Sequence, residues 1–143
     1  DFLGVEVPAA KLAAEISDLL AITAQVKPSG RRFLYLIWRD PYMIAGPDTY
    51  ISRLLESFGL VNAYQGSERY PALTVKAVNQ LEPERIFISS EPFPFRSRHI
   101  AMLQTEGVHC NRIDKIDGRT CSWFGWRTLE ALRYVEGLVS RVV

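Results

Sequence analysis

The chain has 143 residues, of which 48% are hydrophobic and 23% charged, and its 17 basic and 16 acidic side chains give a formal net charge of +1. This is the composition of an ordinary globular domain, and it excludes a disordered, collagen-like or coiled-coil chain. The small net charge excludes the basic footprint of a nucleic-acid-binding protein. The longest unbroken apolar run, Phe33–Trp38, is far shorter than the roughly 20 residues of a membrane-spanning helix.

The first expected elements are a helix and a buried strand. Apolar residues recur at helical spacing and predict a helix over 8–26, and the continuous apolar run 33–38 predicts a strand buried on both faces. Next, Asp48 is expected to cap a second helix, which Gly59 closes. A short extended piece over 60–64 follows.

Helices and strands alternate in the second half of the chain. Thr74 is expected to cap a short helix that ends at Leu81. The remaining expected elements are a strand over 85–89, a helix over 97–106, a strand over 108–113 and a helix over 128–139. This alternation predicts a single α/β, Rossmann-like lobe, a three-layer sandwich with a mostly parallel sheet.

Three loops follow strands or lead into the last helix, at the edge where parallel sheets bind ligands. They span 38–43, 89–95 and 121–127; all three carry aromatic side chains, and two carry arginine. A flat apolar surface with fixed cations suits a large planar or anionic ligand better than a small metabolite. Trp38 is explained equally well as a core residue, whereas Trp123 lies in a glycine-containing loop, which favours ligand contact.

Catalytic and metal-binding patterns are missing, because the chain has no glycine-rich phosphate or dinucleotide motif and no nucleophile elbow. His99 is expected on a solvated basic helix face and His109 in a structural role on a strand, and neither has a partner at metal-ligand spacing. Cys110 and Cys121 form one bridge or stay as free thiols. An enzyme would need Cys121 or Ser122 as nucleophile, with no histidine near either in sequence, so we expect no enzyme, cofactor or metal site.

Three stretches of the chain together resemble one known family. They are Phe33–Asn62 with G-P-D-T-Y-I, Tyr70–Pro94 with Y-P-A-L-T, L-E-P-E and S-S-E-P, and Ser122–Tyr134 with S-W-F-G-W-R. In order and spacing they are similar to the carboxy-terminal lobe of helical-backbone periplasmic binding proteins. These are the substrate-binding subunits of ABC importers for cobalamin, iron–siderophores and haem. The resemblance covers roughly residues 1–143.

The resemblance implies half of a two-lobed binding protein. Family members hold their ligand, a metal chelate, in a cleft between two α/β lobes joined by one long helix. Residues 1–30 would then be the end of that connecting helix and a following helix, and 31–143 the carboxy-terminal ligand-binding lobe. The amino-terminal lobe would be absent from this chain. The implied location is the periplasm, or a lipid-anchored extracytoplasmic position.

The resemblance also implies a set of ligand-binding residues. They are Trp38, Arg39, Tyr42 and Met43 at the mouth of the cleft, and Trp123 with Arg127 behind it on the other wall. A tryptophan at the Trp123 position contacts ligand in the cobalamin-binding relative. Trp38, Tyr42 and Trp123 would stack on the ligand, and Arg39 and Arg127 would pair with its anionic groups, although Arg39 has a local alternative in Asp40.

Docking to the ABC permease of the inner membrane would use an acidic residue on each lobe. Glu91 is the expected residue on this lobe, ahead of Glu56 and Glu130, and a solvated surface role accounts for each of them as well. A different interpretation is a protein-interaction module whose exposed aromatic face binds a protein partner or a second copy of the chain as a homodimer.

Overall fold

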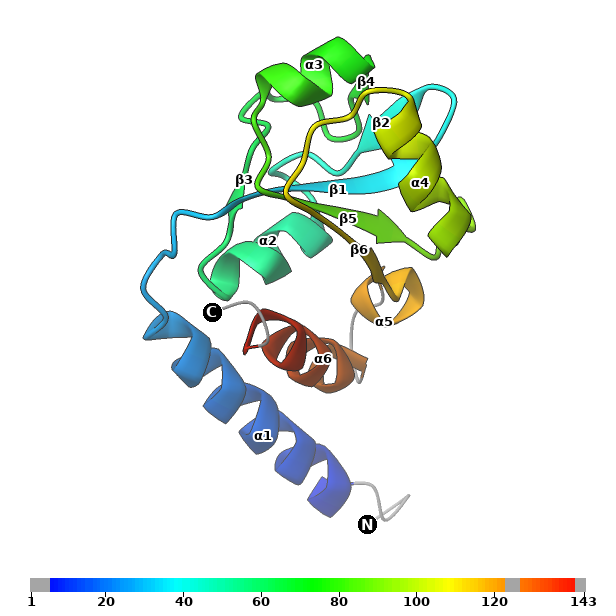
Figure 1. The fold of residues 1–143 in the computed structure, drawn as a ribbon. Coiled ribbons are helices and arrows are strands. Elements are labelled where there is room, and N and C mark those ends of the chain that lie inside the picture. The colour runs from blue at the N-terminus through cyan, green and yellow to red at the C-terminus, as the bar shows by residue number, and fades with distance from the viewer. Residues whose placement is uncertain (1–5, 123–126, 141–143) are drawn as a thin grey trace.

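The computed structural model describes residues 6–122 and 127–140. In this part of the chain six strands form one sheet in the order β4-β2-β1-β5-β6, with β3 also paired to β1 (Figure 1). Their bounds are β1 Arg32–Trp38, β2 Tyr42–Ile44, β3 Val61–Asn62, β4 Ala72–Leu73, β5 Arg85–Ser89 and β6 Arg112–Ile116. β3 and β5 run parallel to β1, β6 runs parallel to β5, and β2 is antiparallel to both β1 and β4. The expected mostly parallel sheet is confirmed.

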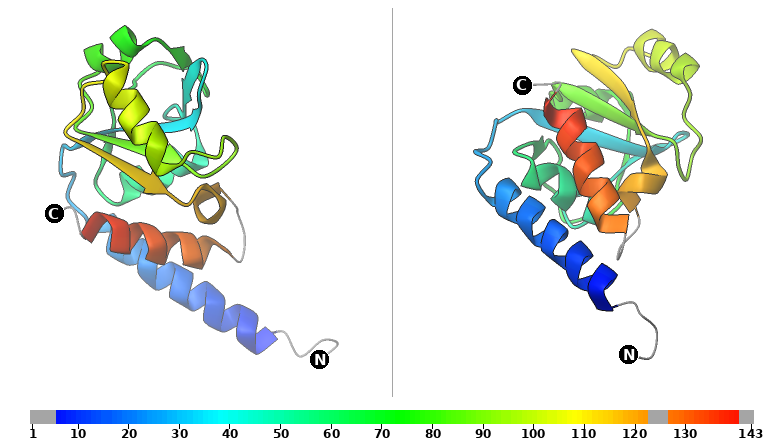
Figure 2. Two further views of the ribbon diagram at one scale, coloured as in Figure 1. Left: turned by 45° about the vertical axis from the view of Figure 1, so that its right-hand side comes forward. Right: turned by 90° about the horizontal axis from the view of Figure 1, so that it is seen from below.

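Helices cover both faces of the sheet (Figure 1, Figure 2). On one face lie α2 (Tyr50–Ser57), α5 (Gly118–Ser122) and α6 (Thr128–Ser140), and α1 (Glu6–Ala24) lies against α6. On the other face lie α3 (Val75–Gln80) and α4 (Ser97–Thr105). The three-layer α/β arrangement is therefore confirmed. Among the described helices, none combines the length and apolar character that a bilayer span requires.

Strand β1 serves the cores on both faces of the sheet. Phe33 and Tyr35 pack towards α2 and α6, whereas Leu34 and Leu36 pack towards α3 and α4. Burial on both faces explains why this strand is a continuous apolar run instead of an alternating one. The two cysteines lie on opposite faces of the sheet, and both are free thiols. Cys121 belongs to the core of Phe33 and Tyr35, and Cys110 packs beside the core of Leu34 and Leu36.

The cap of α2 corrects one sequence expectation. Thr49, not Asp48, is the N-cap, and its Oγ1 accepts the backbone N–H of Ser52 at 3.3 Å. The backbone of Thr49 is extended, with φ −114° and ψ 150°, as an N-cap requires. Asp48 instead stands in solvent with its carboxylate 4.0 Å from Arg53.

Glycine 59 closes α2 as predicted, at φ +84°. A Cβ there would lie 2.8 Å from the carbonyl oxygen of Lys27. The linker before β1 is fastened at the same place, because the backbone N–H and the hydroxyl of Ser29 both donate to the carbonyl of Gly59 at 2.7 Å. The end of α2 thus holds the segment that leads from α1 into the sheet.

The third long strand begins later than predicted, at Arg112 instead of Val108. Gly107 has φ +88°, and the N–H of Val108 bonds back to Leu103 at 2.9 Å, which ends α4. The N–H of His109 donates to Oδ1 of Asn79 on α3 at 2.8 Å. These bonds hold the segment among the helices, and His109 is an exposed residue outside any strand.

Candidate functional site

The carboxyl ends of β1 and β5 bring two of the predicted loops into contact. Trp38, the last residue of β1, is 41% exposed, and its ring meets the ring of Phe93 edge-on with centroids 5.6 Å apart. The N–H of Phe93 donates to the carbonyl of Ile37 at 3.3 Å. Trp38 is therefore neither a core residue nor a loose surface residue, because it is exposed on one side and supported on the other.

An aromatic row made of Trp38, Phe93, Phe95 and His99 extends from this edge into the core. The ring centroids of Phe93 and Phe95 are 4.6 Å apart, and the His99 ring lies 5.4 Å from Phe93 and 5.7 Å from Phe95. Phe95 is 1% exposed. The row gives Trp38 a rigid backing, so little side-chain freedom is lost when a ligand contacts it.

The position of His99 overturns the expectation that it lies on a solvated helix face. The residue is 5% exposed, and its Nδ1 accepts the backbone N–H of Arg96 at 2.8 Å, which caps α4. His99 follows Arg96 by one helical turn and precedes the buried Leu103 by another, so it faces inward while its arginine neighbours face out. Burial and the nearby charges of Arg98, Arg39 and Arg96 lower the pKa of His99.

The structure also corrects the loop predicted over 38–43, which was expected to place Tyr42 and Met43 at the mouth of the cleft. Both residues belong to β2, which turns back along β1, so Tyr42 is buried and Met43 is partly buried. The Tyr42 hydroxyl donates to Oε2 of Glu106, at the end of α4. Tyr42 therefore presents no open face to stack on a ligand.

Arg39 is paired across the fold and not with its neighbour Asp40. Its Nη2 donates to Oε1 of Glu106 at 2.5 Å. Hydrogen bonds from Tyr42 and Arg39 lower the pKa of Glu106, which keeps it ionised. In the described part of the chain the Arg39 Nε has no partner, so the guanidinium keeps one buried donor unsatisfied.

The loops after β5 and β6 are joined by hydrogen bonds. The N–H of Ser90 donates to the carbonyl of Ile116, and the Ser90 hydroxyl accepts the N–H of Gly118, both at 3.0 Å. Gly118 is needed for this contact, because a Cβ there would lie 2.1 Å from Oγ of Ser89 and 3.0 Å from the backbone of Glu91. The second loop is thus joined to the segment after β6, as it is joined to the first loop.

Asp117 organises the segment directly after β6 and was missed by the sequence reasoning. Its carboxylate accepts the Thr120 hydroxyl at 2.7 Å and the Arg119 N–H at 3.0 Å. Burial raises the pKa of Asp117, but hydrogen bonds from Thr120 and Arg119 outweigh it and lower the pKa overall. The signal in the sequence was an aspartate before a glycine, with a threonine three residues on, which is typical of a helix start.

The remaining expected residues have mixed positions. Trp123 lies outside the described residues, and Arg127 is partly buried directly before α6. Glu91 is exposed, and its backbone is fixed by Ser89, whose Oγ accepts the Glu91 N–H at 3.3 Å and donates to the Glu91 carbonyl at 2.5 Å. Glu56 is partly buried, whereas Glu130 is exposed.

One of the two candidate nucleophiles of this edge is poorly suited to catalysis. The thiol of Cys121 is buried, and burial raises its pKa to about 12, so it stays protonated and is a poor nucleophile. Among the described residues, no three His, Cys, Asp or Glu side chains are grouped to hold a metal ion. An exposed tryptophan with rigid aromatic backing and a nearby guanidinium can bind a flat apolar group that carries an anion.

Comparison with known proteins gives a fold and no sequence relative. No family model matches the chain, and no curated protein matches its sequence. Among solved structures, it is similar to the periplasmic haem-binding protein BhuT in complex with two haems, with a TM-score of 0.72 and 22% identity over 90% of this chain and 53% of that one. The periplasmic haem-binding protein RhuT from Roseiflexus sp. RS-1 gives 0.70 and 22%, over 89% of this chain and 52% of that one.

A third similar structure is the periplasmic vitamin B12-binding protein BtuF of Vibrio cholerae, with a TM-score of 0.62 and 19% identity over 86% of this chain and 48% of that one. The chain thus spans about half the length of each of these proteins. The expected resemblance is confirmed for the fold, which is that of half of a periplasmic binding protein. The matched proteins are named for the ligands they bind and not for a reaction.

Proposed function

We propose that the chain is the carboxy-terminal lobe of the substrate-binding subunit of an ABC importer for a metal chelate of the cobalamin, ferric-siderophore or haem class. The supporting observation is the fold, which matches about half of several periplasmic binding proteins. In this proposal residues 31–143 form the lobe, 1–30 include the end of the interlobe helix, and ligand lies between this lobe and an amino-terminal one. The protein works in the periplasm or from a lipid anchor, and no covalent bond changes.

The ligand surface in this proposal is the carboxyl edge of the sheet, with Trp38 as its first contact. Trp38 is the one large aromatic of that edge whose described side chain is both exposed and backed by another ring. Stacking on such a ring suits a planar macrocycle. Trp123 and Arg127 remain proposed for the opposite wall, where the third loop leads into α6.

Tyr42 and Met43, both expected as ligand contacts, take different roles in this proposal. Tyr42 holds Glu106, and Glu106 holds Arg39, so Tyr42 is proposed as a positioning residue and not as a stacking one. An anionic group of the ligand would pair with the partly exposed guanidinium of Arg39, whose Nε has no partner among the described residues. Met43, partly buried beside them on β2, would contribute apolar contact only.

Glu91 is proposed as the permease contact of this lobe. It is exposed, and Ser89 fixes its backbone, so its side chain projects from a rigid part of the loop. Exposed charge on a rigid support is well suited to pairing with an arginine of a partner at little entropic cost.

The test is a titration of tryptophan fluorescence with cobalamin, cobinamide, haemin and several ferric siderophores, corrected for their absorbance. Saturable quenching by one class is expected, with micromolar or weaker affinity because in this proposal the chain supplies one wall of a cleft shared by two lobes. Trp38→Ala and Trp123→Ala should each weaken binding at least tenfold. Tyr70→Ala, an exposed aromatic outside this edge, is the matched control and should change nothing.

Two outcomes would count against the proposal. Nanomolar binding by this chain would contradict a cleft shared by two lobes. A flat response to every compound, together with a tight ligand-independent dimer in sedimentation, would favour the interaction module instead.

A further inference from the structure

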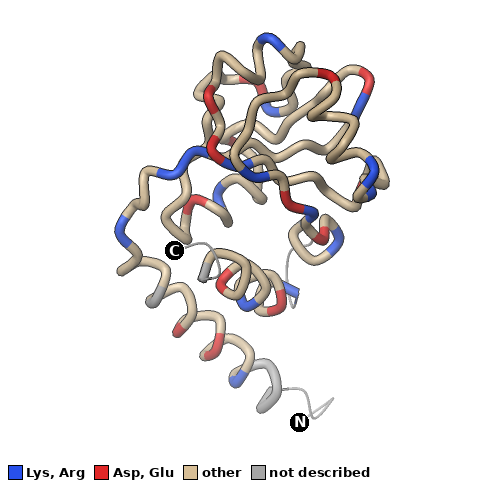
Figure 3. Tube along the Cα trace, in the orientation of Figure 1, with Lys and Arg blue, Asp and Glu red and all other residues tan. Residues whose placement is uncertain are grey.

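The amino edge of the sheet, at the opposite end of the strands from Trp38, carries a cluster of arginines. Arg32, Arg85 and Arg112 are the first residues of β1, β5 and β6, and the parallel register places Arg85 directly beside Arg112. Figure 3 shows basic positions gathered on the trace where these strands begin. Like charges on neighbouring strands repel each other, so this edge needs compensating negative charge.

Arg85 is the buried member of the cluster. Its side chain is 5% exposed, its Nε donates to Oδ2 of Asp114 at 2.7 Å, and its guanidinium carbon lies 4.7 Å from the centre of the Phe87 ring. Within the described part of the chain, Nη1 and Nη2 have no hydrogen-bond partner. Burial lowers the pKa of Arg85 while Asp114 opposes that effect, and a guanidinium remains charged even so. Two buried donors of a charged group are therefore unsatisfied, which is costly.

The carboxylate of Asp114 is shared by two arginines. Asp114 also accepts the Nε of Arg112, at 3.0 Å to its Oδ1. Arg133, on α6, turns to α1 instead, where it pairs with Glu15 at 2.7 Å. Asp114 therefore compensates only part of the charge of Arg85 and Arg112.

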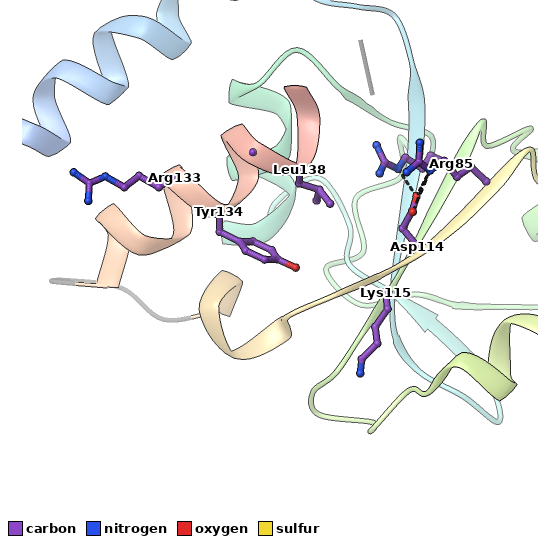
Figure 4. Close-up of a pocket in the computed structure, with 8 residues that line it drawn as sticks. Arg85, Asp114, Lys115, Arg133, Tyr134 and Leu138 are labelled. Carbon is purple, nitrogen blue, oxygen red and sulfur yellow. Dashed lines mark hydrogen bonds and ion pairs between the residues drawn. The ribbon is translucent and has the colours of Figure 1, made fainter. Parts of the chain in front are cut away.

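Two cavities, of about 410 and 420 Å³, open beside these side chains. Arg85 and Arg112 line both, so they stand between them. The lining groups that carry charge are basic Arg31, Arg85, Arg112, Lys115 and Arg133, and acidic Glu84 and Asp114. Figure 4 shows Arg85 and Asp114 on the sheet side and Tyr134 and Leu138 on the α6 side of the first cavity. Both volumes fall within the roughly 300–1,000 Å³ of small-ligand sites.

We propose that this amino edge binds an oxyanion of the phosphate class, held by Nη1 and Nη2 of Arg85 and by Arg112. The two terminal nitrogens form the fork that binds two oxygens of a phosphate side by side. The side chain of Arg112 is about half exposed, so an anion can reach it from solvent. The source is free phosphate or a small phosphomonoester, because a headgroup fixed in a bilayer cannot reach a guanidinium that is 5% exposed.

This proposal does not depend on the proposed transport function, because the site lies at the other edge of the sheet and uses none of the same residues. Its test is a titration of the chain with inorganic phosphate, followed through the Nε–H signals of the arginine side chains in ¹⁵N-correlated NMR spectra. Sodium chloride at equal ionic strength and sodium acetate serve as parallel titrations.

Saturable shifts of the Arg85 and Arg112 signals at millimolar or lower phosphate are expected, with acetate at least tenfold weaker and chloride without saturation. Arg85→Met should abolish the saturable binding and Arg112→Gln should weaken it at least tenfold. Arg53→Gln, an exposed arginine on α2, is the matched control and should bind within twofold of the unmodified chain.

Equal phosphate binding by Arg85→Met and the unmodified chain would overturn the proposal. So would shifts that grow linearly and are the same with chloride, or binding of acetate as tight as that of phosphate. If Arg85→Met does not fold, Arg112→Gln provides the test, because it alters a side chain that is about half exposed. Unchanged phosphate binding by Arg112→Gln would also overturn the proposal.

Discussion

At the carboxyl edge of the sheet, Ser89, Ser90 and Asp117 bond the loops to one another, and an aromatic row backs Trp38. At the amino edge, Arg85 is buried, its Nη1 and Nη2 have no partner among the described residues, and cavities lie on either side of it. The same parallel strands therefore end in a well-packed surface at one edge and, at the other, in a buried charge that Asp114 compensates only in part. A rigid surface can bind a ligand by its shape, whereas a buried guanidinium can bind an anion that supplies its missing hydrogen bonds.

The largest expected effect is at the filled edge, in Phe95→Ala. Phe95 is 1% exposed and packs between Phe93 and His99, so its loss should lower the free energy of unfolding by about 3–5 kcal/mol. Urea unfolding measures it, with the exposed Tyr70→Ala as the control, expected within about 0.5 kcal/mol of the unmodified chain. A loss below about 1 kcal/mol for Phe95→Ala would mean that this edge is not tightly packed.

At the amino edge, replacing a buried side chain should leave the free energy of unfolding unchanged or raise it. Arg85→Met replaces a poorly satisfied buried charge with an apolar chain, and Asp114 keeps Arg112 as its partner. Replacing a complete buried ion pair by apolar residues is often neutral or stabilising by about 1–4 kcal/mol, and here Arg112 keeps Asp114 from being left without a partner. In phosphate-free buffer we expect Arg85→Met to unfold at the same or a higher urea concentration. A marked loss of stability would remove the contrast between the two edges.

Alanine substitutions at two glycines test the same difference between the edges, with smaller expected changes in stability. A Cβ on Gly118 would meet Ser89 and the Glu91 backbone, so Gly118→Ala should destabilise by about 1–3 kcal/mol. Gly137 lines the amino-edge cavity within α6, where a Cβ meets nothing within 4 Å. Gly137→Ala should stabilise by up to about 1 kcal/mol because alanine is the better helix former. Unfolding midpoints with the same sign for both variants would contradict the distinction.

The smallest expected effect is a pH dependence at the filled edge. Because the pKa of His99 is lowered by burial, the unfolded chain takes up a proton there first as pH falls below the ordinary value of about 6.5. The contribution of neutral His99 to stability is thus complete above that pH and declines as pH drops towards the folded-state pKa.

His99→Asn keeps an acceptor for the N–H of Arg96 and removes the titration. Unfolding at pH 7.5 and 5.5 should show a smaller loss of stability for His99→Asn than for the unmodified chain. An equal loss in both would assign the pH dependence to other groups.

The sequence predicted those parts of the fold that local signals determine. The apolar run of β1, the strand 85–89, the Thr74 cap of α3 and the Gly59 closure of α2 were all found where expected. Each depends on residues within one turn or one strand. The shifted start of β6 depends on Asn79 of α3, a partner 30 residues away from His109, which no local pattern shows.

The candidate site was less predictable for the same reason. The edge itself follows from strand order, and the contact of Trp38 with Phe93 follows from two loops that share that edge. The pairing of Arg39 with Glu106 joins residues 67 apart and depends on how α4 packs, so the sequence suggested Asp40 instead. No sequence pattern singles out Arg85, because its importance depends on donors that have no partner among the described residues.

The hydrogen bond between Tyr35 and Ser89 joins adjacent parallel strands through residues 54 positions apart. Closing so long a loop costs chain entropy before the core contacts that offset this cost have formed. Domains rich in such long-range pairings therefore fold more slowly than domains built from local contacts. The β1–β2 turn can form early on its own, whereas the aromatic backing of Trp38 needs β5 in place. The exposed tryptophan should therefore acquire its native fluorescence late in refolding, after the helices have formed.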